Sequence, residues 1–328
     1  MPSDFAVEGG KRPVPKRVVA VGGVNMDVSV SSQTRLLPND STPGEIHCTP
    51  GGVARNVAEN LARLGINVSL ISVLGGDLFG QRLAEATAQA GVNVDTLQVL
   101  PDHRTASYMA LHGPAGELSF AVNDMRILEA LSPTLLQTHQ QWLQLADCVV
   151  LDCNLSSPSL AWLLQPVTTR DALPPIFVDG VSVAKCTRLM PHLAHIHTLK
   201  VNRLEAQALT GQALGCVDDA LRASRQLHDL GVRNVVLSLG KDGACWCDDL
   251  GQVGHSPSGN VQIVNTNGAG DAMTAGLVHA YLLGLPLREA VDWASACAQI
   301  TLASVQANAP TLSPAAVQSH LRLETETK

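Results

Sequence analysis

The segment NTNGAGDAMTAG, residues 265–276, places three small residues directly before a single carboxylate. Gly268, Ala269 and Gly270 precede Asp271, and an apolar run begins there. Backbone amides at the start of a helix bind anions, and glycine lets the backbone come close to a bound group. Asp271 could then take a proton from a hydroxyl that attacks a phosphoryl group. A helix N-cap aspartate after a glycine turn would look the same, and this segment alone favours neither interpretation.

The elements around this segment decide whether it can form such a site. Residues 260–265 (NVQIVN) are typical of a strand, and residues 271–284 have the apolar spacing of a helix. We therefore expect the small residues to form a strand-to-helix turn with Asp271 in the first turn of the helix.

Two better-known nucleotide motifs do not fit the chain. A phosphate-binding loop of the Walker type requires Ser or Thr after Gly-Lys, and Asp242 follows Gly240 and Lys241. A dinucleotide-binding motif requires Gly or Ala where Met273 stands.

Composition limits the classes of function. The chain of 328 residues has a formal net charge of -7 and no cluster of Lys and Arg, and it contains only four Trp, two Tyr and four Phe. These features argue against a nucleic acid partner, which needs basic patches or stacking platforms. Its eight cysteines include no CxxC pair, so we expect buried, reduced thiols rather than a disulfide framework or a zinc site.

Apolar runs of strand length alternate with segments of helical periodicity along most of the chain. This alternation predicts a three-layer α/β/α domain with a mostly parallel central sheet, and 45% hydrophobic residues suffice for a large core. Two segments, about 28–49 and 104–124, alternate polar and apolar residues and predict a small antiparallel sheet beside the core. We expect a flexible tail over residues 1–16 and a single domain over 17–320.

Polar residues follow several of the predicted strands. Asn25 and Asp27 close the first strand, and residues 50–65 contain a second glycine turn that leads into a helix. Residues 199–206 place Asn202 and Glu205 three positions apart at a strand-to-helix junction, and SLGKDG (238–243) forms a further glycine turn. Open α/β sheets bind ligands at the carboxyl ends of their strands, although each of these segments taken singly is also ordinary turn chemistry.

In this order and combination, GGVARN, NRLE, SLGKDG and GAGD resemble the ribokinase-like carbohydrate and nucleoside kinases of the PfkB type, over roughly residues 17–315. The resemblance implies an α/β/α domain with a small β lid, and transfer of the γ-phosphate of ATP, with Mg²⁺, to a hydroxymethyl group of a sugar. It implies that Asp271 is the catalytic base and that the amides of Gly268, Ala269 and Gly270 form an anion hole.

The resemblance also implies the binding residues. Expected ligands for the sugar hydroxyls are Asn25, Asp27, Gly52 and Asn56. Expected contacts to ATP come from Asn202, Ser238, Gly240, Gly243, Gly268 and Ser295, and Glu205 is expected to bind Mg²⁺ through water. Asn265 stands where the family usually has the Asp associated with K⁺ activation, so a requirement for K⁺ is left open.

Within the family, TPGGVARNVAENLARLG, AVNDM and HTLKVNRLEA are most similar to the pseudouridine kinases, which implies phosphorylation of the 5′-hydroxyl of pseudouridine. Candidate contacts to the nucleoside are Asn123, Asn154 and Lys200. The alternatives are another kinase of the family, acting on ribose, adenosine or fructose, and a silent protein that only binds a nucleoside. We further expect a cytoplasmic protein without nucleic acid or membrane partners, a lid that closes over the substrate, and a homodimer formed through the lid.

Overall fold

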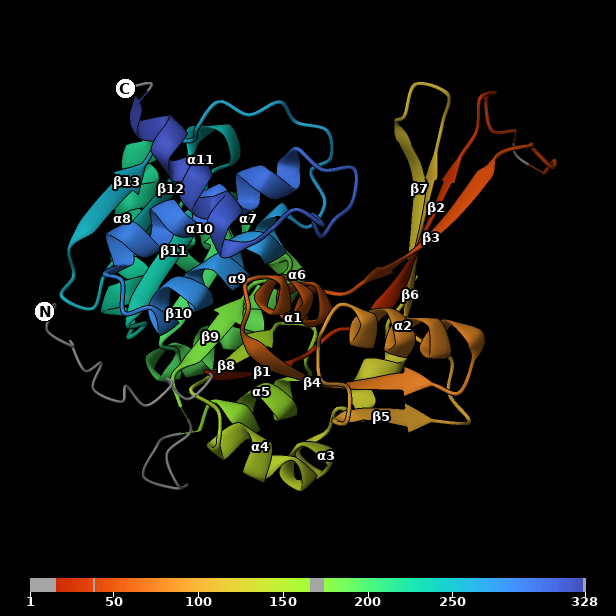
Figure 1. The fold of residues 1–328 in the computed structure, drawn as a ribbon, viewed down its shortest axis with the longest axis horizontal. Helices are drawn as coiled ribbons and strands as arrows, with labels where there is room; N and C mark the ends of the chain where they lie inside the picture. The colour runs from red at the N-terminus through yellow and green to blue at the C-terminus, as the bar shows by residue number, and fades with distance from the viewer. Residues whose placement is uncertain (1–15, 38, 166–173, 327–328) are drawn as a thin grey trace, which may run out of the picture.

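The computed structural model describes residues 16–37, 39–165 and 174–326. Residues 1–15 of the predicted tail lie outside this range. In the described residues a sheet of nine strands runs through the middle of the molecule (Figure 1). In sheet order its strands are β13 (Val253–Ser256), β12 (Ala244–Cys247), β11 (Asn234–Ser238), β10 (Thr198–Asn202), β9 (Ile176–Asp179), β8 (Cys148–Asp152), β1 (Arg17–Val21), β4 (Asn67–Gly75) and β5 (Leu97–Leu100).

The central sheet is parallel from β5 to β11, and only β12 and β13 pair antiparallel. Both faces are covered, as the alternation along β1 shows: Val18 and Ala20 belong to one apolar cluster, Val19 and Val21 to the other. A parallel sheet buried on both faces gives the continuous apolar runs seen in the sequence. The predicted α/β/α class is confirmed.

Each face of the sheet has its own layer of helices. One layer contains α1 (Val53–Arg63), α2 (Leu78–Gln89), α9 (Ala269–Leu282), α10 (Leu287–Leu302) and α11 (Pro314–Glu326). The other contains η1 (Arg126–Ala130), α3 (Pro133–Thr138), α4 (Gln140–Gln144), α5 (Ser157–Leu163), α6 (Val183–Cys186), η3 (Thr187–His195), α7 (Arg203–Thr210) and α8 (Val217–Asp229). Among the described residues, no helix is both long and apolar enough to cross a bilayer.

A second, smaller sheet projects from the α/β/α body (Figure 1). Its strands, in order, are β3 (Glu45–Gly51), β2 (Asn25–Ser31), β6 (Ser107–His112) and β7 (Leu118–Asp124). The outer pairs are antiparallel as expected, but β2 and β6 at the centre run parallel. The two hairpins lie far apart in the sequence, so nothing local specified how they would meet.

The strand expected at residues 260–265 is absent. Residues 257–266 have no regular structure, and the amides of Val264 and Asn265 both donate to the carbonyl oxygen of Leu302, at 2.8 and 3.2 Å. The end of α10 therefore binds two amides of this segment, which pairs with no strand among the described residues. Ile263 and Val264 remain exposed, so the apolar alternation did not reflect burial in a sheet.

Candidate active site

Asp271 lies in the first turn of α9, at the amino end of a helix of 14 residues. Gly268 caps this helix with a φ of 77°. A Cβ at Gly268 would overlap the carbonyl oxygen of Ala307, so only glycine fits both the backbone angle and the space. The first amides of a helix have no partner within it, so those of Gly268, Ala269 and Gly270 lie where the sequence predicts an anion site.

The surroundings of Asp271 raise its pKa to about 7. Burial is the largest cause, and the neighbouring carboxylate of Asp179 adds to it. Two groups oppose this shift: Asn56 donates from Nδ2 to Oδ2 of Asp271 at 2.8 Å, and Lys200 acts by its charge. A carboxyl whose pKa lies near neutrality is suited to accept a proton from a hydroxyl.

Lys200 and Asp179 form a buried ion pair next to the start of α9. Lys200 Nζ lies 3.1 Å from Asp179 Oδ2, and Thr274 of α9 donates its hydroxyl to the same oxygen at 2.6 Å. A Cβ on Gly270 would stand 2.8 Å from Lys200 Nζ, so the lysine lies directly against the turn before Asp271. Burial lowers the pKa of Lys200, but Asp179, Asp271 and Glu205 outweigh it and the net shift is upward. Lys200 is therefore held as a cation at this turn.

A second buried carboxylate, Asp152 at the end of β8, joins the loops around the site. Its Oδ2 accepts hydrogen bonds from the amides of Gly23 and Ala54, both at 2.8 Å. The glycine turn before α1 thereby packs against the end of β1. Gly52, the N-cap of α1, has a φ of 101°, and a Cβ there would lie 2.6 Å from Cα of Val24.

The residues expected to bind sugar hydroxyls gather near this junction. Asn25 donates from Nδ2 to Oδ1 of Asp27 at 2.6 Å on β2. Burial raises the pKa of Asp27, although Asn25 and Arg55 oppose the shift. Asn56 is bonded to Asp271, so one of the predicted substrate residues is engaged with the predicted base.

Asn123 and Asn154 line one cleft of about 770 Å³. Asn123 is exposed at the end of β7, and Asn154 follows β8, where its Oδ1 accepts from Lys185 Nζ at 2.6 Å. The cleft also contains Met125 and Arg188. With Asp124 and Glu129 also on its walls, the cleft combines amide, cationic, acidic and apolar groups.

The sequence motifs did not predict two side chains of this region, Lys185 and Tyr108. Lys185 was missed because nothing near it resembles a binding motif. Tyr108 lies between Asp27 and Asn123 in the cross-strand register of the small sheet, so all three share a face. A register shift between Leu111 and His112 lies in the β6–β7 pair, and without it Asn123 would face the other side of the sheet from Tyr108.

Asn202 and Glu205 form a capping box at the start of α7. The side chain of Asn202 accepts from the Glu205 amide at 3.0 Å, and Glu205 accepts from the backbone and side chain of Asn202 at 2.9 and 2.7 Å. This is the structural role that the N-x-x-E spacing also predicts. Among the described residues, no group of three or more His, Cys, Asp or Glu side chains is placed to hold a metal by itself.

The remaining predicted nucleotide residues are more dispersed. Ser238 ends β11, Gly240 is the first residue of the turn η4 (Gly240–Asp242) that follows it, and Gly243 comes directly after this turn. Ser295 is partly exposed on α10, and within the described part of the chain it has no hydrogen bond to the other predicted nucleotide residues. Asn265 holds a local turn, because its Nδ2 donates to the carbonyl of Val305 and its Oδ1 accepts from the amide of Asn267.

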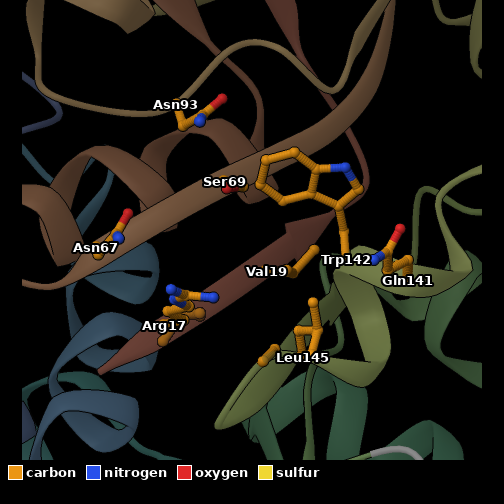
Figure 2. Close-up of a pocket in the computed structure, with 10 residues that line it drawn as sticks. Arg17, Val19, Asn67, Ser69, Asn93, Gln141, Trp142 and Leu145 are labelled. Atoms are coloured by element: carbon orange, nitrogen blue, oxygen red, sulfur yellow. The ribbon is translucent and has the colours of Figure 1, made fainter. Parts of the chain in front are cut away.

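A separate cavity of about 450 Å³ lies at the other end of the strands (Figure 2). It is bordered by Arg17 and Asn67, the first residues of β1 and β4, with Trp142 on α4 across from them. None of the predicted site residues lines it. The residues with candidate chemistry thus gather at the carboxyl ends of the strands, as is usual in open α/β sheets.

Comparison with known proteins identifies the family of this chain. The model of the pfkB family of carbohydrate kinases matches residues 15–314. The chain belongs to this family. A pfkB kinase is a phosphotransferase with an alcohol group as acceptor, and it binds a small-molecule sugar or nucleoside.

Two relatives from Escherichia coli K12 are similar over most of their length. The chain is 42% identical to a pseudouridine kinase, over 92% of this chain and 95% of the relative. It is 39% identical to an uncharacterized sugar kinase, YeiI, over 90% of this chain and 80% of the relative.

Solved structures show the same fold. A carbohydrate kinase from Agrobacterium tumefaciens, 31% identical, superposes with a TM-score of 0.83 over 94% of this chain and 97% of the other. Arabidopsis thaliana ribokinase, solved with ribose and ATP, is 23% identical and has a TM-score of 0.84 over 94% and 99%. The predicted membership of the pfkB family is confirmed.

Proposed function

We propose that this pfkB kinase phosphorylates the 5′-hydroxyl of pseudouridine with ATP, giving pseudouridine 5′-phosphate and ADP. The observation that carries the proposal is the position of Asp271: a carboxylate with a pKa near 7, behind the amides of Gly268 to Gly270 at the start of α9. The identity of 42% with a pseudouridine kinase supports the choice of substrate.

In the proposed reaction Asp271 accepts the proton of the 5′-hydroxyl. The oxygen forms a bond to the γ-phosphorus while the bond from that phosphorus to the ADP oxygen breaks. The amides of Gly268, Ala269 and Gly270 and the cation of Lys200 stabilise the negative charge on the transferring group. Asn25 and Asp27 would hold the ribose, and Asn123 and Asn154, across their shared cleft, would bind the uracil ring.

Contacts to ATP are proposed for the turn after β11, the start of α7 and the middle of α10, through Asn202, Ser238, Gly240, Gly243 and Ser295. Mg²⁺ would neutralise phosphate charge when bound with ATP. Glu205 fits a contact to this ion through water, because a carboxylate that accepts two hydrogen bonds from Asn202 still has free lone pairs. K⁺ activation is not part of the proposal, since Asn265 is engaged in its local turn.

The small sheet is proposed to act as the lid and to form a homodimer. Its Asp27 face would close over the substrate. The opposite face carries two apolar rows across the four strands, listed by register as Cys48, Val28, Met109 and Val122, and Ile46, Val30, Leu111 and Phe120. Several of these side chains are exposed, and a second copy of the chain would cover them.

The experiment that tests the proposed function follows the product by ³¹P NMR in a mixture of enzyme, pseudouridine, ATP and Mg²⁺. We expect a phosphate monoester coupled to the two 5′ protons and one ADP per product. Asp271→Asn should bind both substrates and lose about 10²–10⁴-fold in kcat. Phosphorylation of ribose or fructose in preference to pseudouridine would favour the alternative, another kinase of the family, which the similarity to YeiI supports.

A further inference from the structure

The buried Arg55 on α1 lies next to Asn56 and makes an unusual set of contacts. Its Nη2 pairs with Glu59 one turn later, and its Nη1 donates to Oδ1 of Asn56 at 3.2 Å. The guanidinium is almost fully buried, and its Nε has no hydrogen-bond partner within the described part of the chain. Burying a charged group with one donor unsatisfied costs stability, so an ordinary surface ion pair does not explain it.

The contact to Asn56 fixes the direction of an amide. An asparagine side chain has an oxygen that accepts and a nitrogen that donates, and rotation by half a turn exchanges them. Because Arg55 can only donate, Oδ1 of Asn56 must face it. Nδ2 is thereby directed to Oδ2 of Asp271, 2.8 Å away. The backbone of Asn56 is also held, since Asn308 Nδ2 donates to its carbonyl at 2.9 Å.

We propose that Arg55 is a positioning residue for the catalytic base: it locks the Asn56 amide so that its NH₂ group, and not its oxygen, faces Asp271. The inference rests on the proposed phosphotransfer, in which Asp271 is the base. Arg55 touches neither Asp271 nor the reacting atoms, and its proposed effect on Asp271 passes through Asn56.

The other charged groups around Asp271 make this orientation matter. Asp179 from β9 and Asp152 from β8 repel the ionised form of Asp271, and Lys200 from β10 stabilises it. Asn56 from α1 is the hydrogen-bond donor to the Asp271 side chain. With the amide reversed, an oxygen would face the carboxylate and add to the repulsion, so the pKa of Asp271 would rise and its ionised fraction at neutral pH would fall.

The test compares Arg55→Met with Arg63→Met. Arg63 contacts the same Glu59 from the next turn, with Nε at 3.1 Å, and does not contact Asn56. Arg55→Met should lower kcat/KM by about 10–100-fold, the range seen when a reacting group is misplaced, and should move the acid limb of the pH profile to higher pH. Arg63→Met should retain the wild-type pH profile. Equal profiles for the two variants would overturn the proposal.

A double-mutant cycle with Asn56→Ala separates positioning from a general loss of packing. If Arg55 acts through Asn56, Arg55→Met should reduce kcat/KM little further in the Asn56→Ala background. An equal fold loss in both backgrounds would show that Arg55 acts independently and would contradict the inference. Arg55→Lys keeps the charge and serves as a second variant should Arg55→Met fold poorly. We expect its pH profile to lie between those of wild type and Arg55→Met. A wild-type profile in Arg55→Lys, together with a shifted profile in Asn56→Ala, would argue against the guanidinium contact.

A carboxyl ¹³C NMR titration of Asp271 gives a readout that does not require turnover. Arg55→Met should raise the pKa of Asp271, and Arg63→Met should leave it at the wild-type value. If wild type fails to phosphorylate any nucleoside or sugar, the proposed function fails, and this titration still decides whether Arg55 orients Asn56. An unchanged pKa in Arg55→Met would reject the inference even in an active enzyme.

Discussion

At the residue scale, the environment of Asp271 distinguishes it from the other carboxylates of the site. Asp152 and Glu205 both have raised pKa values because of burial, yet their oxygens are occupied by backbone amides or by Asn202. Asp271 accepts a side-chain hydrogen bond from Asn56 and lies at the helix end where an anion would bind. These features support the proposal that Asp271 exchanges a proton with the substrate.

The pH dependence of activity follows from this pKa. The base must be ionised, so kcat/KM should rise about tenfold per pH unit below a pKa near 7 and level off above it. Asp179→Asn removes a repelling charge and leaves Lys200 free to stabilise Asp271, so both changes should lower the pKa of Asp271. We expect the acid limb to move to lower pH in that variant, measured by initial rates from pH 5 to 9. An unchanged acid limb of the pH profile would show that Asp179 does not set the pKa of Asp271.

At the element scale, the start of α9 brings the site together. The helix packs along α10 and α1, and its first turn meets Lys200 from β10 and Asn56 from α1. This convergence depends on the backbone at Gly268, where a left-handed residue directs the chain into the helix beside Ala307. A small shift of this turn would move the amides and Asp271 together.

Gly268→Ala should therefore reduce activity far more than a stability loss would explain. The left-handed angle costs a residue with a Cβ about 1–2 kcal/mol, and the overlap with Ala307 forces the turn to move. Gly284→Ala is the matched control, because Gly284 follows the other end of α9 with a φ of 76° and has open space around it. It should lower thermal stability by a similar strain and keep wild-type kcat. Equal kcat in the two variants would refute a role for this turn.

The sequence predicts the individual turns, helices and strands, but it does not predict the contacts between distant segments. The GAGD turn before a helix and the parallel strands follow from local patterns, because glycine and apolar periodicity act over a few residues. The segment at 260–265 has strand-like alternation, but a strand also needs a neighbour, and the end of α10 binds its amides instead. The cluster of Asp179, Lys200 and Thr274 joins three distant parts of the chain and left no local pattern. The capping box at Asn202 and Glu205 was readable, since S/T/N-x-x-E is a helix-start pattern.

At the scale of the whole molecule, the small sheet has two different faces. Near the body, Val28 of its apolar face belongs to the core cluster and α2 contacts β2 and β3, whereas farther out the same face is open to solvent. Ile46, Phe120 and Val122 are each about two-thirds exposed there. An exposed apolar face of this extent on a projecting sheet favours self-association, which would also hold the opposite, Asp27-bearing face in place above the site.

Phe120→Lys should convert the proposed homodimer to a monomer, because it places a charge on an edge strand of the exposed apolar face that the partner would cover. Sedimentation equilibrium would measure the change. Leu250→Lys is the control, since Leu250 is a more exposed apolar residue in the β12–β13 turn and should leave the dimer intact. A monomeric wild type, or a dimer unaffected by Phe120→Lys, would exclude this face as the interface.

Measurement of kcat/KM with ATP and Mg²⁺ for pseudouridine, uridine, adenosine, ribose and fructose, with wild type and Asp271→Asn, tests both the proposed substrate and the proposed base. We expect pseudouridine to have the highest kcat/KM of the five, and Asp271→Asn to retain binding while its turnover is nearly abolished. A higher value for another substrate would contradict the assignment of pseudouridine, and turnover by Asp271→Asn near the wild-type rate would contradict the role of Asp271 as the base.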